Sequence, residues 1–345
     1  MGPSDIGNGS SEEHTYTKII DVDEEKALPP SSRASTDTLP PPYDNGKIAI
    51  TSFRERFINL QCVLLNTFST VAIVFVNKTI FSDPQLRHCQ TLVAMWHFFA
   101  TAVVLYVATK SPFNLFKAVK LPLWHMVPIS AFFGGFLLLG NLSLSLNTVG
   151  FYQLAKIMTT PTVVLLNFIL LRKTISATML LAIFSVCAGV GLTSATLALS
   201  NMIGAFAAVS AFTVTALYQI WIGKKIAELK VSAPQLLLNQ APVSVVILAF
   251  FVPLGDKIPD VNRIQSPVLW TLFLSGILAS LLNLSQFLII GRTSALTFNI
   301  VSNLKNIIIL SLGWYQEGHV PTLQDTFGIF LAVGGAWSYA QMSQK

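Results

Sequence analysis

Residues 152–161 read YQLAKIMTTP, and they place Lys156 inside a long apolar stretch. The sequence before them includes FFGGFLLLGNLSLSL, and the sequence after them continues TVVLLNFILL. Together these segments are long enough for a helix that crosses a bilayer, which needs about 20 mostly apolar residues. A charge at the bilayer centre costs roughly 2.5–3.5 kcal/mol on insertion scales, so this lysine needs a physical reason to be there.

The composition is that of a membrane protein with a polar N-terminal segment. Of the 345 residues, 52% are hydrophobic and 11% are charged, whereas soluble domains carry about 25% charged residues. Residues 1–52 are rich in Ser, Pro and acidic side chains, so we expect a disordered cytosolic tail there. The tail lacks the features of a secretory signal, and its acidity argues against a transit peptide. The first membrane span is then expected to act as the insertion signal.

The rest of the chain predicts an all-α integral membrane protein with ten transmembrane helices. The predicted spans are 57–76, 91–108, 124–144, 148–170, 178–196, 202–222, 234–253, 268–290, 295–315 and 323–341. An even number of spans puts both termini on the same side of the membrane.

The distribution of basic residues predicts which side that is, because cytosolic loops carry an excess of Lys and Arg. Thirteen basic residues fall on the side of the termini: Lys47, Arg54, Arg56, Lys110, Lys117, Lys120, Arg172, Lys173, Lys224, Lys225, Lys230, Arg292 and Lys345. Four fall on the opposite side: Lys78, Arg87, Lys257 and Arg263. Both termini are therefore predicted to be cytosolic.

Two basic residues, Lys156 and Lys305, remain inside predicted spans. They lie in the fourth and ninth spans, which are equivalent positions if five spans are repeated. An Asn-Leu-Ser tripeptide precedes each of them, at 141–143 and at 283–285. We therefore expect a 5+5 inverted repeat, with residues 53–198 as the first unit and 199–345 as the second. Inverted repeats of this kind build a central site in many secondary transporters.

The sign of the buried charges predicts the class of solute. The interiors of the predicted spans hold no Asp or Glu, which a cation-coupled carrier would normally use to bind its ion. A site with two ammonium groups instead favours an anion such as a phosphate between them. Snorkelling of both lysines to an interface is the structural alternative, but both are expected near mid-depth.

Polar neighbours of the two lysines complete the predicted binding site. Amides and hydroxyls of this kind suit a sugar or a nucleobase, although in membrane helices they also join one helix to another. Pro161 has no N–H for the Ile157 carbonyl, so a kink is expected beside Lys156. The substrate-binding candidates are Lys156, Lys305, Tyr152, Gln153, Thr159, Ser302, Asn303, Asn306, Asn77 and Lys78.

The sequence shows no sign of an enzyme. It has no P-loop, no GxSxG and no HExxH pattern, and its three cysteines have no metal-like spacing. We expect no cofactor, no metal and no nucleic-acid partner. The lipid bilayer is the expected surrounding, and the oligomeric state stays open, a homodimer included.

Four segments carry a resemblance to a known family. NLSLSLNTVGFYQLAKIMTTP, ALYQIWIGKK, LLLNQAP and NLSQFLIIGRTSALTFNIVSNLKN together resemble the triose-phosphate/nucleotide-sugar transporters of the drug/metabolite transporter superfamily. The likeness spans about residues 56–341 and is greatest to the solute carrier 35 subfamily E group. It implies ten helices, cytosolic termini, a Golgi or ER membrane, and exchange of a nucleotide sugar for its nucleoside monophosphate. It also implies that Lys156 and Lys305 hold phosphate.

One residue departs from part of that family. Asn306 follows the second lysine, where the plastid sugar-phosphate exchangers carry Arg, and the GALNK segment of GDP-mannose carriers is also absent. These differences favour a Golgi antiporter for a UDP-sugar. A sugar-phosphate or phosphoenolpyruvate exchanger remains an alternative, and a transport-inactive membrane scaffold is the alternative from another class.

Overall fold

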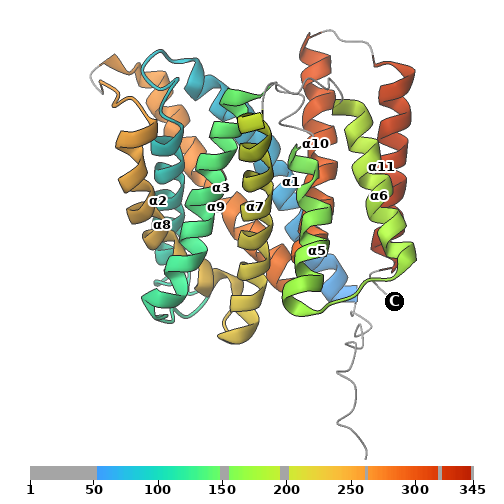
Figure 1. Ribbon diagram of the computed structural model, residues 1–345. Helices are drawn as coiled ribbons and strands as arrows, with labels where there is room; N and C mark the ends of the chain where they lie inside the picture. The colour runs from blue at the N-terminus through green and yellow to red at the C-terminus, as the bar shows by residue number, and fades with distance from the viewer. Residues whose placement is uncertain (1–52, 148–154, 195–201, 261–262, 318–320, 343–345) are drawn as a thin grey trace, which may run out of the picture. The chain divides into compact units, whose positions relative to one another are not determined.

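The helices of the protein follow its apolar segments closely, as a computed structural model of the chain shows (Figure 1). The structure describes residues 53–147, 155–194, 202–260, 263–317 and 321–342, and these residues contain no β-strand. The ten main helices in this part of the chain are α1 (Phe53–Ser82), α2 (Gln90–Ala108), α3 (Leu123–Leu146), α5 (Thr159–Leu171), α6 (Ala177–Ser194), α7 (Met202–Glu228), α8 (Ala233–Gly255), α9 (Ser266–Arg292), α10 (Ala295–Glu317) and α11 (Leu323–Met342). They all belong to one compact unit, Ile48–Lys345.

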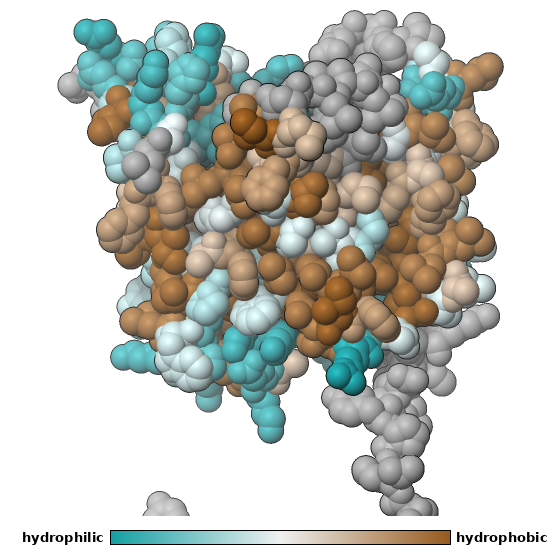
Figure 2. All heavy atoms as spheres, in the orientation of Figure 1, coloured by the Kyte–Doolittle hydropathy of each residue, from teal (hydrophilic) through white to brown (hydrophobic). Residues whose placement is uncertain are grey.

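Six of the described helices, α1, α2, α3, α7, α8 and α9, are long and apolar enough to cross a membrane. Shorter apolar helices cover Ala155–Leu171, Ala177–Leu192 and Ala295–Ile309. Figure 2 shows the consequence on one face, where a broad hydrophobic zone lies between hydrophilic side chains at either end. Hydrocarbon offers no hydrogen-bond partners, so a segment in the membrane has to pair its own backbone groups, as a helix does. Described residues that form helices with this hydrophobic zone are therefore those of a membrane protein.

Acidic residues within the described helices lie only in first or last turns. They are Glu55, Glu228, Glu317 and Asp325. Asp325 accepts hydrogen bonds from the backbone N–H and the hydroxyl of Thr322, at 2.8 and 2.7 Å, and so caps the start of α11. Helix interiors in this part of the chain are therefore free of carboxylates, as the sequence predicted.

The helix is interrupted beside Lys156, at the place where the sequence predicted a kink. Ala155–Ile157 are helical, Met158 forms a turn, and α5 begins at Thr159, two residues before Pro161. The interruption follows from proline chemistry, because Pro161 cannot donate to the Ile157 carbonyl. It separates the short segment that carries Lys156 from the body of α5.

Helix packing joins the first half of the sequence to the second. α6 packs on α11, α3 on α7 and α8, α1 on α9, and α2 on α8 and α9. Figure 1 shows α6 and α11 side by side at one edge. Two large apolar clusters fill the interior, one including Phe98, Met126 and Phe287, the other including Val163 and Ile300.

The α6–α11 contact depends on glycines that let the two backbones touch. A Cβ built on Gly189 would lie 2.5 Å from the Ala332 nitrogen and from the Gly328 oxygen. A Cβ on Gly335 would lie 2.9 Å from the Ala182 oxygen and the Val186 nitrogen. These atoms belong to backbone that cannot easily move aside. At the preceding residue, Gly334, an added Cβ would have no atom within 4 Å.

We therefore predict that Gly189→Ala or Gly335→Ala destabilises the protein by about 1–3 kcal/mol, because the added methyl overpacks the helix contact. Gly334→Ala is the matched control and should be neutral or slightly stabilising, since alanine favours the helix. Thermal unfolding in detergent measures the difference. Equal melting temperatures for Gly334→Ala and Gly335→Ala would contradict the prediction.

Candidate functional site

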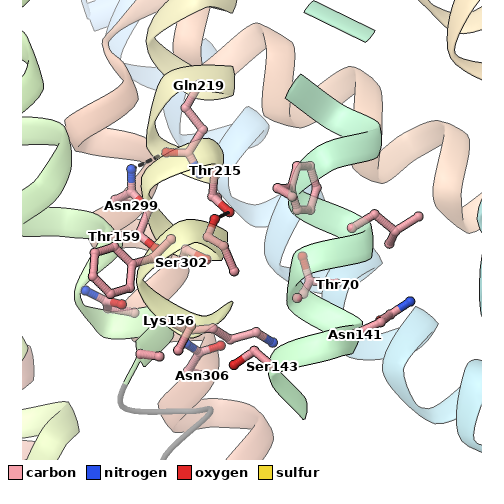
Figure 3. A pocket seen from close by; sticks show the side chains of 18 of the residues that line it. Thr70, Asn141, Ser143, Lys156, Thr159, Thr215, Gln219, Asn299, Ser302 and Asn306 are labelled. Atoms are coloured by element: carbon pink, nitrogen blue, oxygen red, sulfur yellow. Dashed lines mark hydrogen bonds between the residues drawn. The ribbon is translucent and has the colours of Figure 1, made fainter. Parts of the chain in front are cut away.

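A polar cavity of about 350 Å³ opens among α1, α3, α5, α7 and α10 (Figure 3). This volume lies at the lower end of the range of ligand sites, roughly 300–1,000 Å³. Its lining includes one basic side chain, Lys156, and no acidic side chain among the described residues. Small hydroxyl and amide groups supply most of the remaining polarity.

The basic end of the cavity is formed by Lys156, which directly precedes α5, together with residues of α3 and α10. Figure 3 shows Lys156 next to Asn306 of α10 and Ser143 of α3, with Asn141 close by. Lys156 is exposed, and its neighbours Ala155 and Ile157 are buried. Lys156 therefore faces the cavity while its apolar neighbours pack into the protein.

The other end of the cavity is neutral and built from amides. Asn299 Nδ2 donates to Gln219 Oε1 and, at 2.8 Å, to the Ala295 carbonyl. In Figure 3 these two amides and Thr215 lie away from Lys156. Gln219 and Asn299 are both buried, so their hydrogen bonds fix how each amide faces the cavity.

Five of the predicted site residues line this one cavity: Lys156, Thr159, Ser302, Asn303 and Asn306. Asn303 also donates from Nδ2 to Thr160 Oγ1 at 3.0 Å, which joins α10 to α5. Tyr152 and Gln153 lie outside the described residues. Asn77 and Lys78, near the end of α1, do not line the cavity; Lys78 is exposed.

Lys305 does not line the cavity either, which corrects the expectation that both lysines face one site. Its side chain is only 3% exposed, and Nζ donates to Asn66 Oδ1 and, at 3.2 Å, to Thr70 Oγ1. The Phe298 ring centroid lies 5.0 Å from the same nitrogen. Asn66 and Thr70 on α1 therefore hold Lys305 in place. Thr70 is also part of the cavity lining.

Several cavity residues were not among the predicted candidates. They are Thr70, Asn141, Ser143, Thr215, Gln219 and Asn299. Asn141 and Ser143 belong to the Asn-Leu-Ser tripeptide that the sequence repeats, so that repeat was a usable signal. Thr70 and Thr215 are single polar residues in apolar helices, and nothing in the sequence distinguishes them from residues that join helices.

The arrangement suits binding rather than bond-making. A lysine ammonium attracts an anion as a compact point charge, and amides and hydroxyls beyond it can hydrogen-bond uncharged polar groups of the same ligand. Among the described residues, no group of three or more His, Cys, Asp or Glu side chains could hold a metal ion.

A cavity lined by a lysine, amides and hydroxyls among apolar helices is what a membrane transporter of a polar solute needs. The model of the Triose-phosphate Transporter family matches residues 58–340. The chain therefore belongs to the Triose-phosphate Transporter family, as the resemblance in the sequence indicated, and its relatives are transporters rather than enzymes.

Curated relatives from Arabidopsis thaliana match over most of the chain. A "UDP-xylose transporter 1" is 32% identical over 287 residues, covering 81% of this chain and 83% of the relative. A "UDP-rhamnose/UDP-galactose transporter 2" is 30% identical over 282 residues, covering 80% of each. One solved crystal structure has a TM-score of 0.66 at 15% identity and covers 84% of this chain and 99% of its own, which shows a shared fold.

The cavity geometry predicts which positions of α10 meet water. After replacement of Cys62, Cys89 and Cys187, we expect Asn306→Cys to react with a charged methanethiosulfonate much faster than Ile307→Cys. Asn306 lines the cavity, whereas its neighbour Ile307 is 7% exposed and packs in an apolar cluster. Mass spectrometry of the labelled protein gives both rates. Similar rates at the two positions would show that the cavity is not open to water there.

Proposed function

We propose that the protein exchanges a nucleotide sugar, of the UDP-sugar class, for a nucleoside monophosphate by alternating access in the Golgi membrane. The observation that carries this proposal is the cavity with Lys156 at one end and neutral amides at the other. A phosphate of the ligand would lie at Lys156, and the uncharged part would extend towards the amides.

The charge of the cavity supports exchange rather than one-way transport. Lys156 puts an ammonium group at one end of a described lining that holds no acidic residue, so a phosphate group of a ligand would lie against a cation there. Charge inside the membrane is costly, and a bound phosphate lowers the cost of an ammonium group there, so the loaded form should reorient readily. Both the nucleotide sugar and the nucleoside monophosphate bring the phosphate that this requires.

The relatives support the UDP-sugar class. The two relatives reported above are named as UDP-sugar transporters, and each aligns with about four fifths of this chain. A sugar-phosphate or phosphoenolpyruvate exchanger would use the same lysine, and the family is named after triose phosphate. Asn306 lines the cavity where those exchangers carry a second cation, which favours the nucleotide sugar. A transport-inactive scaffold would have no use for a lysine-lined cavity.

We further propose ten membrane crossings arranged as two inverted units, 53–198 and 199–345. The helix contacts are consistent with a pseudo-two-fold axis between the units. Suppose that α1, α2 and α3 correspond in order to α7, α8 and α9. The contact between α3 and α7 then has its counterpart in the contact between α9 and α1. Likewise, the contact between α3 and α8 has its counterpart in the contact between α9 and α2. The distribution of basic residues then supports cytosolic termini. An ER membrane and a homodimer are compatible with the same arrangement.

Counterflow in proteoliposomes tests the function directly. Vesicles preloaded with UMP, GMP, CMP or inorganic phosphate are given labelled nucleotide sugars, and we expect UDP-sugar uptake only with UMP inside. Uptake with phosphate alone would instead support the sugar-phosphate exchanger. Folded protein that transports nothing under any of these conditions would support the scaffold.

Lys156→Ala should reduce exchange to background, because it removes the one positive charge in the described cavity lining. Charge-assisted hydrogen bonds to phosphate are the strong ones, and losing one costs about 1.5–3 kcal/mol or more. Lys257→Ala is the control, since Lys257 is exposed and outside the cavity, and it should exchange normally. Normal exchange by folded Lys156→Ala would remove this lysine from the site.

A further inference from the structure

The second buried lysine sits in a socket of uncharged acceptors. We call Asn66, Thr70 and Phe298 the Lys305 socket, because Nζ donates to the first two and lies over the ring of the third. No Asp or Glu of the described residues forms an ion pair with Lys305. Its ammonium group is therefore held by dipoles alone, in an environment that otherwise excludes water.

The orientation of Asn66 is fixed by α9, so its oxygen has to face the lysine. Asn66 is fully buried, and its Nδ2 donates to Ser285 Oγ at 2.9 Å and to the Leu282 carbonyl at 3.3 Å. Rotating the amide by 180° would direct an N–H towards the ammonium group and lose the bond to the Leu282 carbonyl, which can only accept. Ser285 is the last residue of the second Asn-Leu-Ser tripeptide, which gives this repeat a structural role.

The hydroxyl of Thr70 is fixed in the same way. Thr70 Oγ1 donates to the Asn66 carbonyl at 2.6 Å, which leaves its lone pairs for Lys305 Nζ. Thr70 contacts Lys305 Nζ and also lines the cavity, so the Lys305 socket adjoins the cavity at this residue. The socket thus joins α10 to α1, and through Asn66 to α9.

We propose that Asn66 is a positioning residue that competes with the ligand's phosphate for Lys305. A phosphate oxygen is a stronger partner for an ammonium group than a neutral amide oxygen, because the phosphate carries a negative charge that attracts the ammonium. A phosphate that enters beside Thr70 therefore draws Lys305 out of the socket. Leaving the socket breaks the tie from α10 to α1 and α9, which couples binding to helix movement. This inference rests on the proposed function.

The competition predicts opposite effects for two substitutions of Asn66. Asn66→Asp puts a carboxylate against the ammonium, so Lys305 is held more tightly and the Kd for UMP should rise, on the order of tenfold. Asn66→Ala removes the competing acceptor, so the Kd for UMP should fall severalfold. A residue with a purely structural role would weaken binding in both variants. Isothermal titration of the full-length protein in detergent measures each Kd.

Two further variants control the experiment. Ser69→Ala alters another fully buried polar residue of α1, whose hydroxyl has no hydrogen-bond partner among the described residues, and it should leave the Kd unchanged. In a Lys305→Gln background the two Asn66 substitutions should no longer move the Kd in opposite directions, because the ammonium is gone. Size-exclusion profiles and melting temperatures establish that each variant is folded, and Asn66→Ala still tests the idea if Asn66→Asp is not.

The outcomes separate this inference from the proposed function. Wild-type protein that binds neither UMP nor a UDP-sugar would overturn the proposed function, and binding of inorganic phosphate alone would favour the sugar-phosphate exchanger. If wild-type protein binds UMP but both Asn66 substitutions shift the Kd in the same direction, or not at all, the competition is refuted and the function stands.

Discussion

The need to give every intramembrane charge a partner governs the centre of this structure. Two lysines lie in helical segments that carry no other charge away from their ends, and the described helix interiors hold no carboxylate. Each lysine is accommodated in a different way. Lys156 lines a polar cavity at a helix kink, and Lys305 donates to the amide of Asn66 and the hydroxyl of Thr70.

Polar side chains also join helices around the cavity, both between the two halves of the sequence and within the second half. Asn303 of α10 donates to Thr160 of α5, and Asn299 of α10 donates to Gln219 of α7. Such hydrogen bonds between membrane helices are worth only about 0.6–2 kcal/mol each. They therefore orient the cavity walls and leave each link weak enough to be exchanged for a ligand. An apolar side chain at these positions could not exchange its contact with another helix for a hydrogen bond to a ligand.

Much of the fold could be predicted from the sequence, because apolar run length and proline chemistry are local properties. The helix positions, the kink before Pro161 and the exclusion of carboxylates from helix interiors all follow from them. The site was predicted only in part. Lys156, Ser302 and Asn306 line the cavity, but the placement of Lys305 depends on Asn66, which is 239 residues away in the chain. No local pattern reveals that Asn66 is the acceptor, since an isolated Asn in an apolar helix looks the same whatever it contacts.

The glycine contact between α6 and α11 limits how the halves of the protein can move. At Gly189 and Gly335 the two backbones approach more closely than any side chain would allow. Sliding one helix along the other would bring Cβ atoms into these positions and force the pair apart. Sliding within this pair is therefore disfavoured, so α6 and α11 are expected to keep their register when other helices move.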